Sequence, residues 1–185
     1  MPLSDDQLET LRFPTGRFAA RSVFTAEERA ACIEELDRLP AQIRAAVSGL
    51  GDEDLDTPYR PGGWTIRQVV HHLPDSHMNA YIRCKLAVTS EAPVITGYDE
   101  AAWAELADGA GGDIEPSLAL LEGLHSRWAA FLRSLDDRSL DRTYLHPEMG
   151  PVSVATAIQL YAWHGRHHLG HIMNALAAMP RPVVR

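Results

Sequence analysis

Four segments of this 185-residue chain place apolar residues every three or four positions, which is the spacing of one face of an α-helix. These segments follow Thr25, Thr65, Pro116 and Ser153. Thr25 and Thr65 each stand three residues before a Glu or Gln, the capping-box pattern of a helix start. Strand signals are few. We therefore predict an all-α fold, a four-helix bundle in which long connections provide room for crossovers.

The same patterns predict element boundaries. Pro40 interrupts the first helical pattern, so a kink or break is expected there. The second helix should run from Thr65 to about Thr89, and the last from Ser153 to about Ala178. A short helical piece is expected at 100–106, and a small hairpin at 146–150. The connections are expected at residues 1–24, 51–63, 91–115 and 136–151.

Length and charge narrow the class of protein. A chain of this length predicts a single domain spanning residues 1–185. Its net charge of −8 repels phosphate backbones, which argues against nucleic-acid binding. No apolar run is long enough to span a membrane and no secretion signal is visible, so a cytoplasmic location is expected. Cys32 and Cys84 are then expected to be reduced and packed as small apolar residues.

Histidine is concentrated in one short segment, since four of the nine histidines lie within residues 164–171. In a helix, His164 and His168 would stand one turn apart, and so would His167 and His171. Neutral imidazole is the commonest metal ligand, and a pair at this spacing can direct two ring nitrogens to one ion. The stripe lies beside the apolar arc of the predicted last helix, so a metal site in the flank of the core is the first hypothesis.

A third ligand should come from another helix, because two histidines do not complete a tight site. The second predicted helix offers His71, His72 and His77. His72 is nearer than His71 to the apolar stripe of that helix, and His77 falls within it. Only one member of each His-His doublet can point inward, so His71 and His167 are expected to be partly exposed, to lie at the surface, or to support the ligands from behind. Three histidines with an open fourth position are typical of a catalytic zinc or similar ion.

Two motifs resemble those of a known family. Residues 63–73, GWTIRQVVHHL, and residues 164–170, HGRHHLG, resemble the tryptophan-histidine and H-x-x-H-H-x-G motifs of the DinB-like metalloprotein superfamily. Residues 75–83, DSHMNAYIR, and 161–168, YAWHGRHH, are closer still to its YfiT subgroup. That subgroup comprises bacillithiol S-transferase-like proteins also described as metal-dependent hydrolases. The resemblance extends over nearly the whole chain.

The resemblance implies a four-helix bundle that holds one divalent metal ion per chain, zinc or nickel. Carried over residue by residue, it places the ligands at His72, His164 and His168. His171 stands where the motif often has Gln. It could add a fourth nitrogen or carry a proton, so the resemblance leaves the coordination number open.

The function that the resemblance implies is transfer of a bacillithiol-type low-molecular-weight thiol to an electrophile, with both small molecules as partners. A metal-dependent hydrolase that activates water is one alternative, and a structural or sensory metal-binding bundle is another. No residue is assigned as a catalytic acid or base. Homodimer formation through a spare apolar face is a further expectation. The candidates for substrate contacts are Asp75, Arg83, Glu105, His146 and Arg166.

Overall fold

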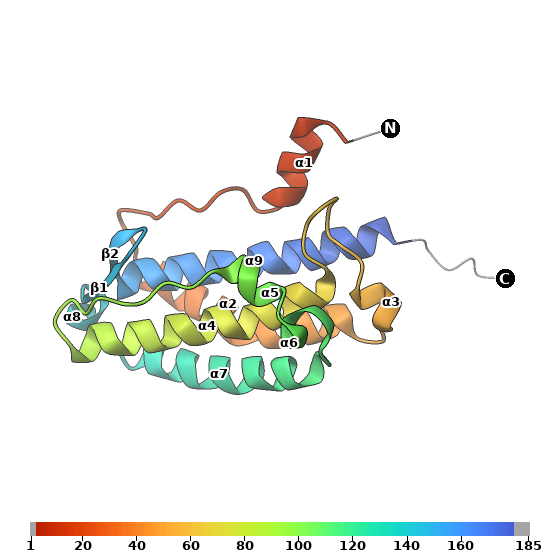
Figure 1. Cartoon of the computed structure of the whole chain (residues 1–185). Coiled ribbons are helices and arrows are strands. Elements are labelled where there is room, and N and C mark those ends of the chain that lie inside the picture. The colour runs from red at the N-terminus through yellow and green to blue at the C-terminus, as the bar shows by residue number, and fades with distance from the viewer. Residues whose placement is uncertain (1–2, 180–185) are drawn as a thin grey trace.

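Four long helices form the body of the computed structural model, which describes residues 3–179 (Figure 1). They are α2 (Ala26–Val47), α4 (Ile66–Thr89), α7 (Glu115–Arg133) and α9 (Val154–Ala178). Helix α2 packs against α7 and α9, and α4 packs against the same two helices. Helices α2 and α4 therefore stand at opposite corners of the bundle, as do α7 and α9, whereas α4 and α7 are neighbours. The predicted four-helix bundle with crossover connections is confirmed.

The long helices begin where the sequence predicts. The side chains of Thr25 and Thr65 accept hydrogen bonds from the backbone N–H groups of Glu28 and Gln68. The Glu28 and Gln68 side chains in turn accept from the backbone N–H groups of the two threonines. The Ser153 side chain likewise accepts a hydrogen bond from the backbone N–H group of Thr156 at the start of α9. Caps of this kind satisfy N–H groups that have no partner inside the helix, which is why the starts can be read from sequence.

The predicted break at Pro40 is wrong, since α2 continues through this residue to Val47. Pro40 is buried, and so are its neighbours Leu39 and Ile43. The apolar contacts of this stretch with the core offset the backbone hydrogen bond that a proline inside a helix removes. Helix α4 likewise continues through Pro74.

The connections carry short elements. They are α1 (Asp5–Arg12), α3 (Asp52–Leu55), α5 (Glu100–Ala104), α6 (Ala107–Gly111), α8 (Asp137–Leu140), β1 (Thr143–His146) and β2 (Gly150–Ser153). Helix α5 and the β1–β2 hairpin confirm the predicted short helix and hairpin, and Gly150 in the hairpin has a positive φ of 71°. Helix α1 lies in the segment 1–24, which the sequence analysis predicts as a connection. It begins with a capping box between Ser4 and Gln7.

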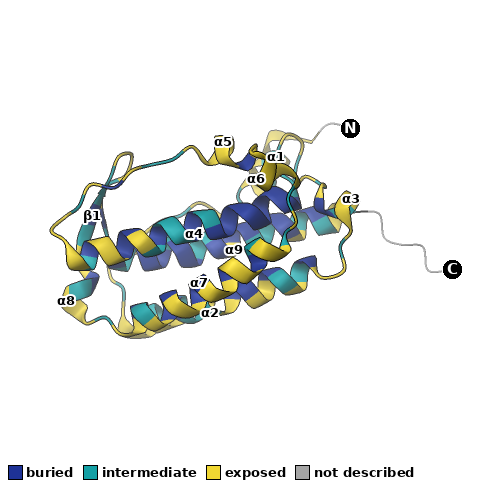
Figure 2. Ribbon diagram, turned by 60° about the horizontal axis from the view of Figure 1, so that its bottom comes forward, coloured by how far each residue is buried: buried dark blue, intermediate teal, exposed yellow. Residues whose placement is uncertain are grey.

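The core is divided into two apolar clusters along the bundle. Buried residues line the inner faces of the long helices and exposed residues their outer faces (Figure 2). One cluster includes Leu36, Ala80, Trp128 and Tyr161, and the other includes Leu39, Leu73, Leu121 and Ile172. In sequence, the stretch between the clusters contains His77 on α4, His125 on α7 and both His164 and His168 on α9. A layer of imidazoles therefore crosses the middle of the bundle.

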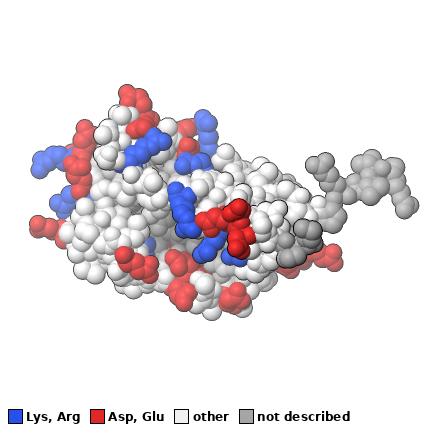
Figure 3. All heavy atoms as spheres, turned by 90° about the horizontal axis from the view of Figure 1, so that it is seen from above, with Lys and Arg blue, Asp and Glu red and all other residues white. Residues whose placement is uncertain are grey.

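Acidic and basic side chains are interspersed on the face of the molecule that carries α1 (Figure 3). Several form ion pairs, such as Arg17 with Glu9 at 2.7 Å. Within residues 3–179, no helix combines the length and apolar character needed to cross a bilayer. Cys32 and Cys84 are both free thiols, and Cys84 is fully buried. Burial raises the pKa of Cys84 to about 12, so this thiol stays protonated at neutral pH.

Candidate metal centre

The structure brings the three predicted ligands together. His72 extends from α4, and His164 and His168 extend from successive turns of α9. One ring nitrogen from each lies within 4.8 Å of the other two. The Nε2 atoms of His72 and His164 are 3.3 Å apart. The convergence of two helices on one point is therefore present, while metal binding by these residues stays a prediction.

Burial keeps the three rings neutral. It lowers the pKa of His72 to about 4 and places the pKa values of His164 and His168 well below the ordinary value. The charges that add to this effect come only from other histidines, and no carboxylate of the described chain is among them. A metal ion binds the neutral form of imidazole, so these rings need not lose a proton at neutral pH to bind one.

Aromatic rings enclose the three histidines. The Trp64 ring lies 4.8 Å from the His72 ring and is stacked at 6.2 Å on His168. The Tyr161 ring lies 5.6 Å from that of His164. Such apolar walls lower the local dielectric and strengthen electrostatic interactions within the site.

The donor spacing fits a small divalent ion. Two nitrogens bound at about 2.0–2.1 Å in tetrahedral geometry lie about 3.3 Å apart. The Nε2 atoms of His72 and His164 have this separation. The donor set consists of three imidazoles, a combination that suits zinc, nickel, copper and iron. The residues present therefore fit a small divalent ion.

Behind His164, a chain of imidazoles crosses the bundle. The Nδ1 atom of His164 lies 3.0 Å from Nε2 of His77, and Nδ1 of His77 lies 2.8 Å from Nε2 of His125. The Nδ1 atom of His125 is hydrogen-bonded to the backbone carbonyl of Leu36 on α2. His77 is fully buried, and the edge-on rings of its neighbours hold it in place. We call His164, His77 and His125, together with the Leu36 carbonyl, the inner chain.

A second chain lies behind His168. Its Nδ1 atom is 3.3 Å from Nδ1 of His171, and Nε2 of His171 is 3.1 Å from the backbone carbonyl of Arg12 at the end of α1. The Tyr59 ring stacks on His171 at 3.8 Å. We call His168 and His171, together with the Arg12 carbonyl, the rim chain. Both nitrogens of His171 already have partners, so His171 supports His168 from behind and is not positioned as a fourth ligand.

Comparison with known proteins gives the family of this chain. The model of the DinB superfamily matches residues 35–172. The chain belongs to the DinB superfamily. Within it, the chain belongs to the YfiT group. It is 48% identical to YfiT of Bacillus subtilis over 163 residues, covering 88% of this chain and 92% of that protein.

Other relatives are equally similar. A protein of Oceanobacillus iheyensis is 51% identical over 163 residues, covering 88% of this chain and 94% of its own. These relatives carry the provisional name of metal-dependent hydrolase. The solved structure of Bacillus subtilis YfiT, described as a four-helix bundle of unusual topology, superposes with a TM-score of 0.88 at 46% identity. It covers 91% of this chain and 97% of that one.

His125 is a residue behind the candidate metal centre that the sequence analysis missed. A signal for it exists in the apolar repeat of α7. Leu118, Leu121, Trp128 and Leu132 are all buried, and position 125 completes their helical spacing. A histidine within an otherwise apolar stripe indicates a buried polar partner on a facing helix, because buried polar groups are hydrogen-bonded.

Of the alternatives expected for His71 and His167, partial exposure and a surface position are wrong, since each residue is only 8% exposed. The Nδ1 atom of His71 lies 2.7 Å from Oγ of Ser117 at the start of α7. The His167 ring stacks on Trp163 at 4.6 Å. The start of α7 and the aromatic residues before α2 cover these faces of the bundle, and the sequence pattern of a single helix does not reveal such covers.

Three of the predicted substrate contacts serve other purposes. The Glu105 side chain accepts a hydrogen bond from the Gln68 side chain at 3.0 Å, which joins the connection after α5 to α4. Arg166 forms an ion pair with Glu35 of α2. Nδ1 of His146 accepts a hydrogen bond within the hairpin turn. None of the three is placed against the ligand triad by these contacts.

Arg83 and Asp75 remain candidates for a role near the site. Arg83 is 6% exposed and donates a hydrogen bond to the Thr96 carbonyl at 3.0 Å. Within residues 3–179 it forms no ion pair with a carboxylate. Burial raises the pKa of Asp75, with the negative charge of Asp108 adding to the effect. A buried guanidinium without a counter-charge is costly, so Arg83 is suited to receive an anion.

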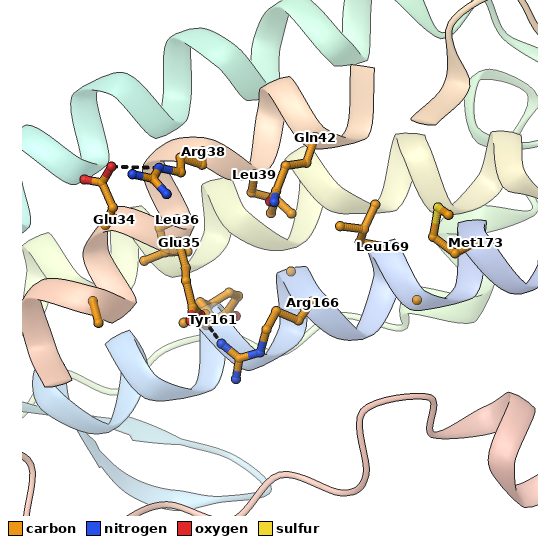
Figure 4. Close-up of a pocket in the computed structure, with 14 residues that line it drawn as sticks. Glu34, Glu35, Leu36, Arg38, Leu39, Gln42, Tyr161, Arg166, Leu169 and Met173 are labelled. Carbon is orange, nitrogen blue, oxygen red and sulfur yellow. Dashed lines mark hydrogen bonds and ion pairs between the residues drawn. The ribbon is translucent and has the colours of Figure 1, made fainter. Parts of the chain in front are cut away.

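A cavity of about 670 Å³ lies between α2 and α9 (Figure 4). Leu39, Leu169 and Met173 contribute apolar surface to it, and two ion pairs stand beside it, Glu34–Arg38 and Glu35–Arg166. None of the three predicted ligands lines this cavity. The cavity therefore does not open directly onto the three ligands, although Tyr161, which flanks His164, also lines it.

Proposed function

We propose that this protein is a metal-dependent enzyme that transfers a low-molecular-weight thiol of the bacillithiol type to an electrophile. His72, His164 and His168 would hold one zinc or nickel ion. The observation that carries the proposal is a triad of buried, neutral imidazoles with no carboxylate among them. When bound, such an ion keeps its full charge and lowers the pKa of a coordinated thiol so far that the thiolate forms.

The composition of the triad favours a thiol over water as the nucleophile. Attack by water usually needs a carboxylate or another base placed beside the ion to take up a proton. Burial, with smaller contributions from neighbouring histidines, lowers the pKa values of the three ligands, and no carboxylate is part of the donor set among the described residues. A thiol, which is far more acidic than water, needs no such base.

The transfer itself is a substitution at the electrophile. The thiol sulfur supplies the electron pair of the new sulfur–carbon bond, and the leaving group departs with the pair of the bond that breaks. The thiol proton passes to solvent. The task of the chain is to hold the sulfur and the electrophilic carbon in line, which accounts for much of the rate gain in reactions of this type.

Arg83 supports an anionic thiol as substrate. It lies three helical turns after His72 on α4, and the two residues face nearly the same side of that helix. Its guanidinium is buried and has no carboxylate partner among residues 3–179. A substrate carboxylate would supply the missing counter-charge through charge-assisted hydrogen bonds.

Hydrolysis is the rival function, and the names of the YfiT-group relatives favour it. A closed structural site has less support, because His171 is engaged behind His168 and does not complete the coordination sphere. The two enzymatic functions differ in what is consumed. One consumes thiol and electrophile together, and the other cleaves an ester or amide in water.

The test loads the purified protein with zinc or nickel and measures both reactions. We expect metal-dependent loss of thiol with monochlorobimane as electrophile, and no comparable cleavage of a panel of esters and amides. The His168→Ala variant, prepared in the same way, controls for metal bound elsewhere. Cleavage without thiol consumption would replace the transferase by the hydrolase, and activity that is independent of metal would refute both.

Arg83→Gln tests the substrate class. We expect the KM for a carboxylate-bearing thiol to rise about tenfold to hundredfold, because a charge-assisted hydrogen bond is lost. The KM for cysteamine, which has no carboxylate, should change little. Equal changes for both thiols would show that Arg83 has a structural role only.

A further inference from the structure

Both hydrogen-bond chains behind the α9 ligands end on a backbone carbonyl, and a carbonyl oxygen can only accept. We propose that His77, His125 and His171 are positioning residues that fix His164 and His168 as Nδ1–H tautomers, so that both Nε2 lone pairs face one point. The inference rests on the proposed metal site. It concerns the metal-free protein, however, and can be tested without any ion.

The direction of the inner chain follows from its end. Since the Leu36 carbonyl accepts, Nδ1 of His125 must carry the proton, and Nε2 of this neutral ring carries a lone pair. That lone pair accepts from Nδ1–H of His77 at 2.8 Å. Nε2 of His77 then accepts from Nδ1–H of His164 at 3.0 Å. The Nε2 atom of His164 is left as an acceptor, and it faces Nε2 of His72.

The rim chain leads to the same result with one histidine fewer. The Arg12 carbonyl accepts from Nε2–H of His171. Nδ1 of His171 then carries the lone pair, and it accepts from Nδ1–H of His168 at 3.3 Å. The Nε2 atom of His168 is again the free acceptor. Two independent chains therefore give both α9 ligands the same tautomer.

This control has a chemical purpose. A histidine that is free in water favours the Nε2–H tautomer, which would place a proton where the ion is to bind. The nitrogen that binds a metal is set by the hydrogen bond of the other ring nitrogen. The inner chain is also all-or-none, because reversing one ring forces its neighbours to reverse and leaves the Leu36 carbonyl without a donor. The site is thus preorganised for a cation before one arrives.

The direct experiment is long-range proton–nitrogen NMR of the metal-free, full-length protein with ¹⁵N-labelled histidine. We expect Nδ1–H tautomers for His77, His125, His164 and His168, and an Nε2–H tautomer for His171. Assignment uses single His→Gln variants. An Nε2–H form of His164 or His168, or a mixture of the two forms at either ligand, would overturn the proposal.

Substitutions at His125 give a second test away from the ligands. His125→Phe removes the acceptor of His77, so we expect His77 and His164 to shift toward Nε2–H and zinc affinity to fall about tenfold to hundredfold. His125→Gln keeps an acceptor near the Nε2 position. It should restore much of the Nδ1–H population of His77 and His164 and much of the zinc affinity. Trp128→Phe is the matched control, since Trp128 packs edge-on against His77 and His125 without belonging to the chain.

The outcomes separate this inference from the proposed function. Unchanged tautomers and zinc affinity in His125→Phe would refute the positioning role, and so would an equal loss in Trp128→Phe, which would indicate packing alone. If the tautomers are as expected but the loaded protein transfers no thiol, the proposed function fails while the tautomer assignment stands. If thiol is transferred but His164 is an Nε2–H tautomer, the tautomer assignment fails while the proposed function stands.

Discussion

The two chains that support the α9 ligands are anchored in different regions of the molecule. The inner chain ends on Leu36 of α2, which is 1% exposed, and its members His77 and His125 are among the most deeply buried side chains. The rim chain ends on Arg12 of α1, a helix in which no residue is buried. Two ligands one turn apart on α9 are thus held by the core on one side and by a peripheral helix on the other.

This difference shows how a bundle can combine a rigid and an adjustable ligand. The inner chain forms only when α2, α4, α7 and α9 have packed, because each of its members comes from one of these helices. The rim chain depends on α1, which can separate from α9 at little cost in buried surface. We therefore expect changes in the inner chain to affect the whole fold and changes in the rim chain to affect mainly the site.

Removing a ligand should have the largest effect. We expect His164→Ala and His168→Ala each to lose bound zinc after dialysis, as measured by metal analysis. Zinc at a thousand times its Kd should stabilise the original protein by about 4 kcal/mol, and it should not stabilise either variant. His164→Ala should also destabilise the metal-free protein more than His168→Ala, by about 1–3 kcal/mol, since His77 then lacks a donor in the core. Zinc retained by His168→Ala would remove this residue from the ligand set.

The second largest difference between the inner chain and the rim chain is expected in the dependence of stability on acid. Burial lowers the pKa values of His125 and His171 to about 4 in the folded protein, against 6.5 for an ordinary histidine. The unfolded chain therefore binds more protons between these values. The free energy of unfolding is at its full value above pH 6.5 and falls as the pH drops toward 4, by about 1.4 kcal/mol per pH unit for each such histidine.

Urea unfolding of the metal-free protein over this pH range measures the slope. His125→Phe should reduce it by nearly the full value for one histidine. His171→Phe should reduce it less, because detachment of α1 lets His171 take up a proton while the bundle stays folded. Equal reductions would show that the rim is as firmly held as the core.

Two glycines of α9 provide a comparison of packing. A Cβ at Gly165 would lie 2.6 Å from Cδ2 of Leu39, which is buried in the core. A Cβ at Gly170 would lie 2.7 Å from Cγ of Pro14, in the segment after α1. We expect Gly165→Ala to destabilise the protein by about 1–2 kcal/mol, because overpacking outweighs the gain in helix propensity. Gly170→Ala should be neutral or stabilising by up to about 1 kcal/mol, since Pro14 can move away. Thermal unfolding of both variants checks the difference.

The smallest effect is expected from the ring that covers the rim chain. Tyr59→Leu removes the stacking on His171, which contributes about 0.5–1.5 kcal/mol. Zinc affinity should therefore fall by no more than about tenfold, while the tautomers of the inner chain remain unchanged. Competition with a chromogenic chelator measures the affinity. A shift in the NMR signals of His77 would contradict the independence of the two chains.

Much of the fold could be predicted because the signals for it are local. Thr25, Thr65 and Ser153 begin their helices through hydrogen bonds to residues three positions ahead, and these pairs are visible in the sequence. The break predicted at Pro40 as an alternative to a kink does not occur, since the packing of α2 against α7 and α9 outweighs the local cost of a proline. The exposure expected for His71 and His167 was wrong for a similar reason, because distant segments cover them.

By itself, the sequence determined the helices, the family and the set of histidines from which a metal site can be built, because helical spacing and side-chain chemistry are written in the order of residues. Only the tertiary structure decided that His125 reaches His77, that His171 stands behind His168, and that the carbonyls of Leu36 and Arg12 end the two chains. Every residue except proline has the same backbone donor and acceptor, so a carbonyl that sets a tautomer leaves no mark in the sequence. Its role arises only when folding brings it to a ring from another helix.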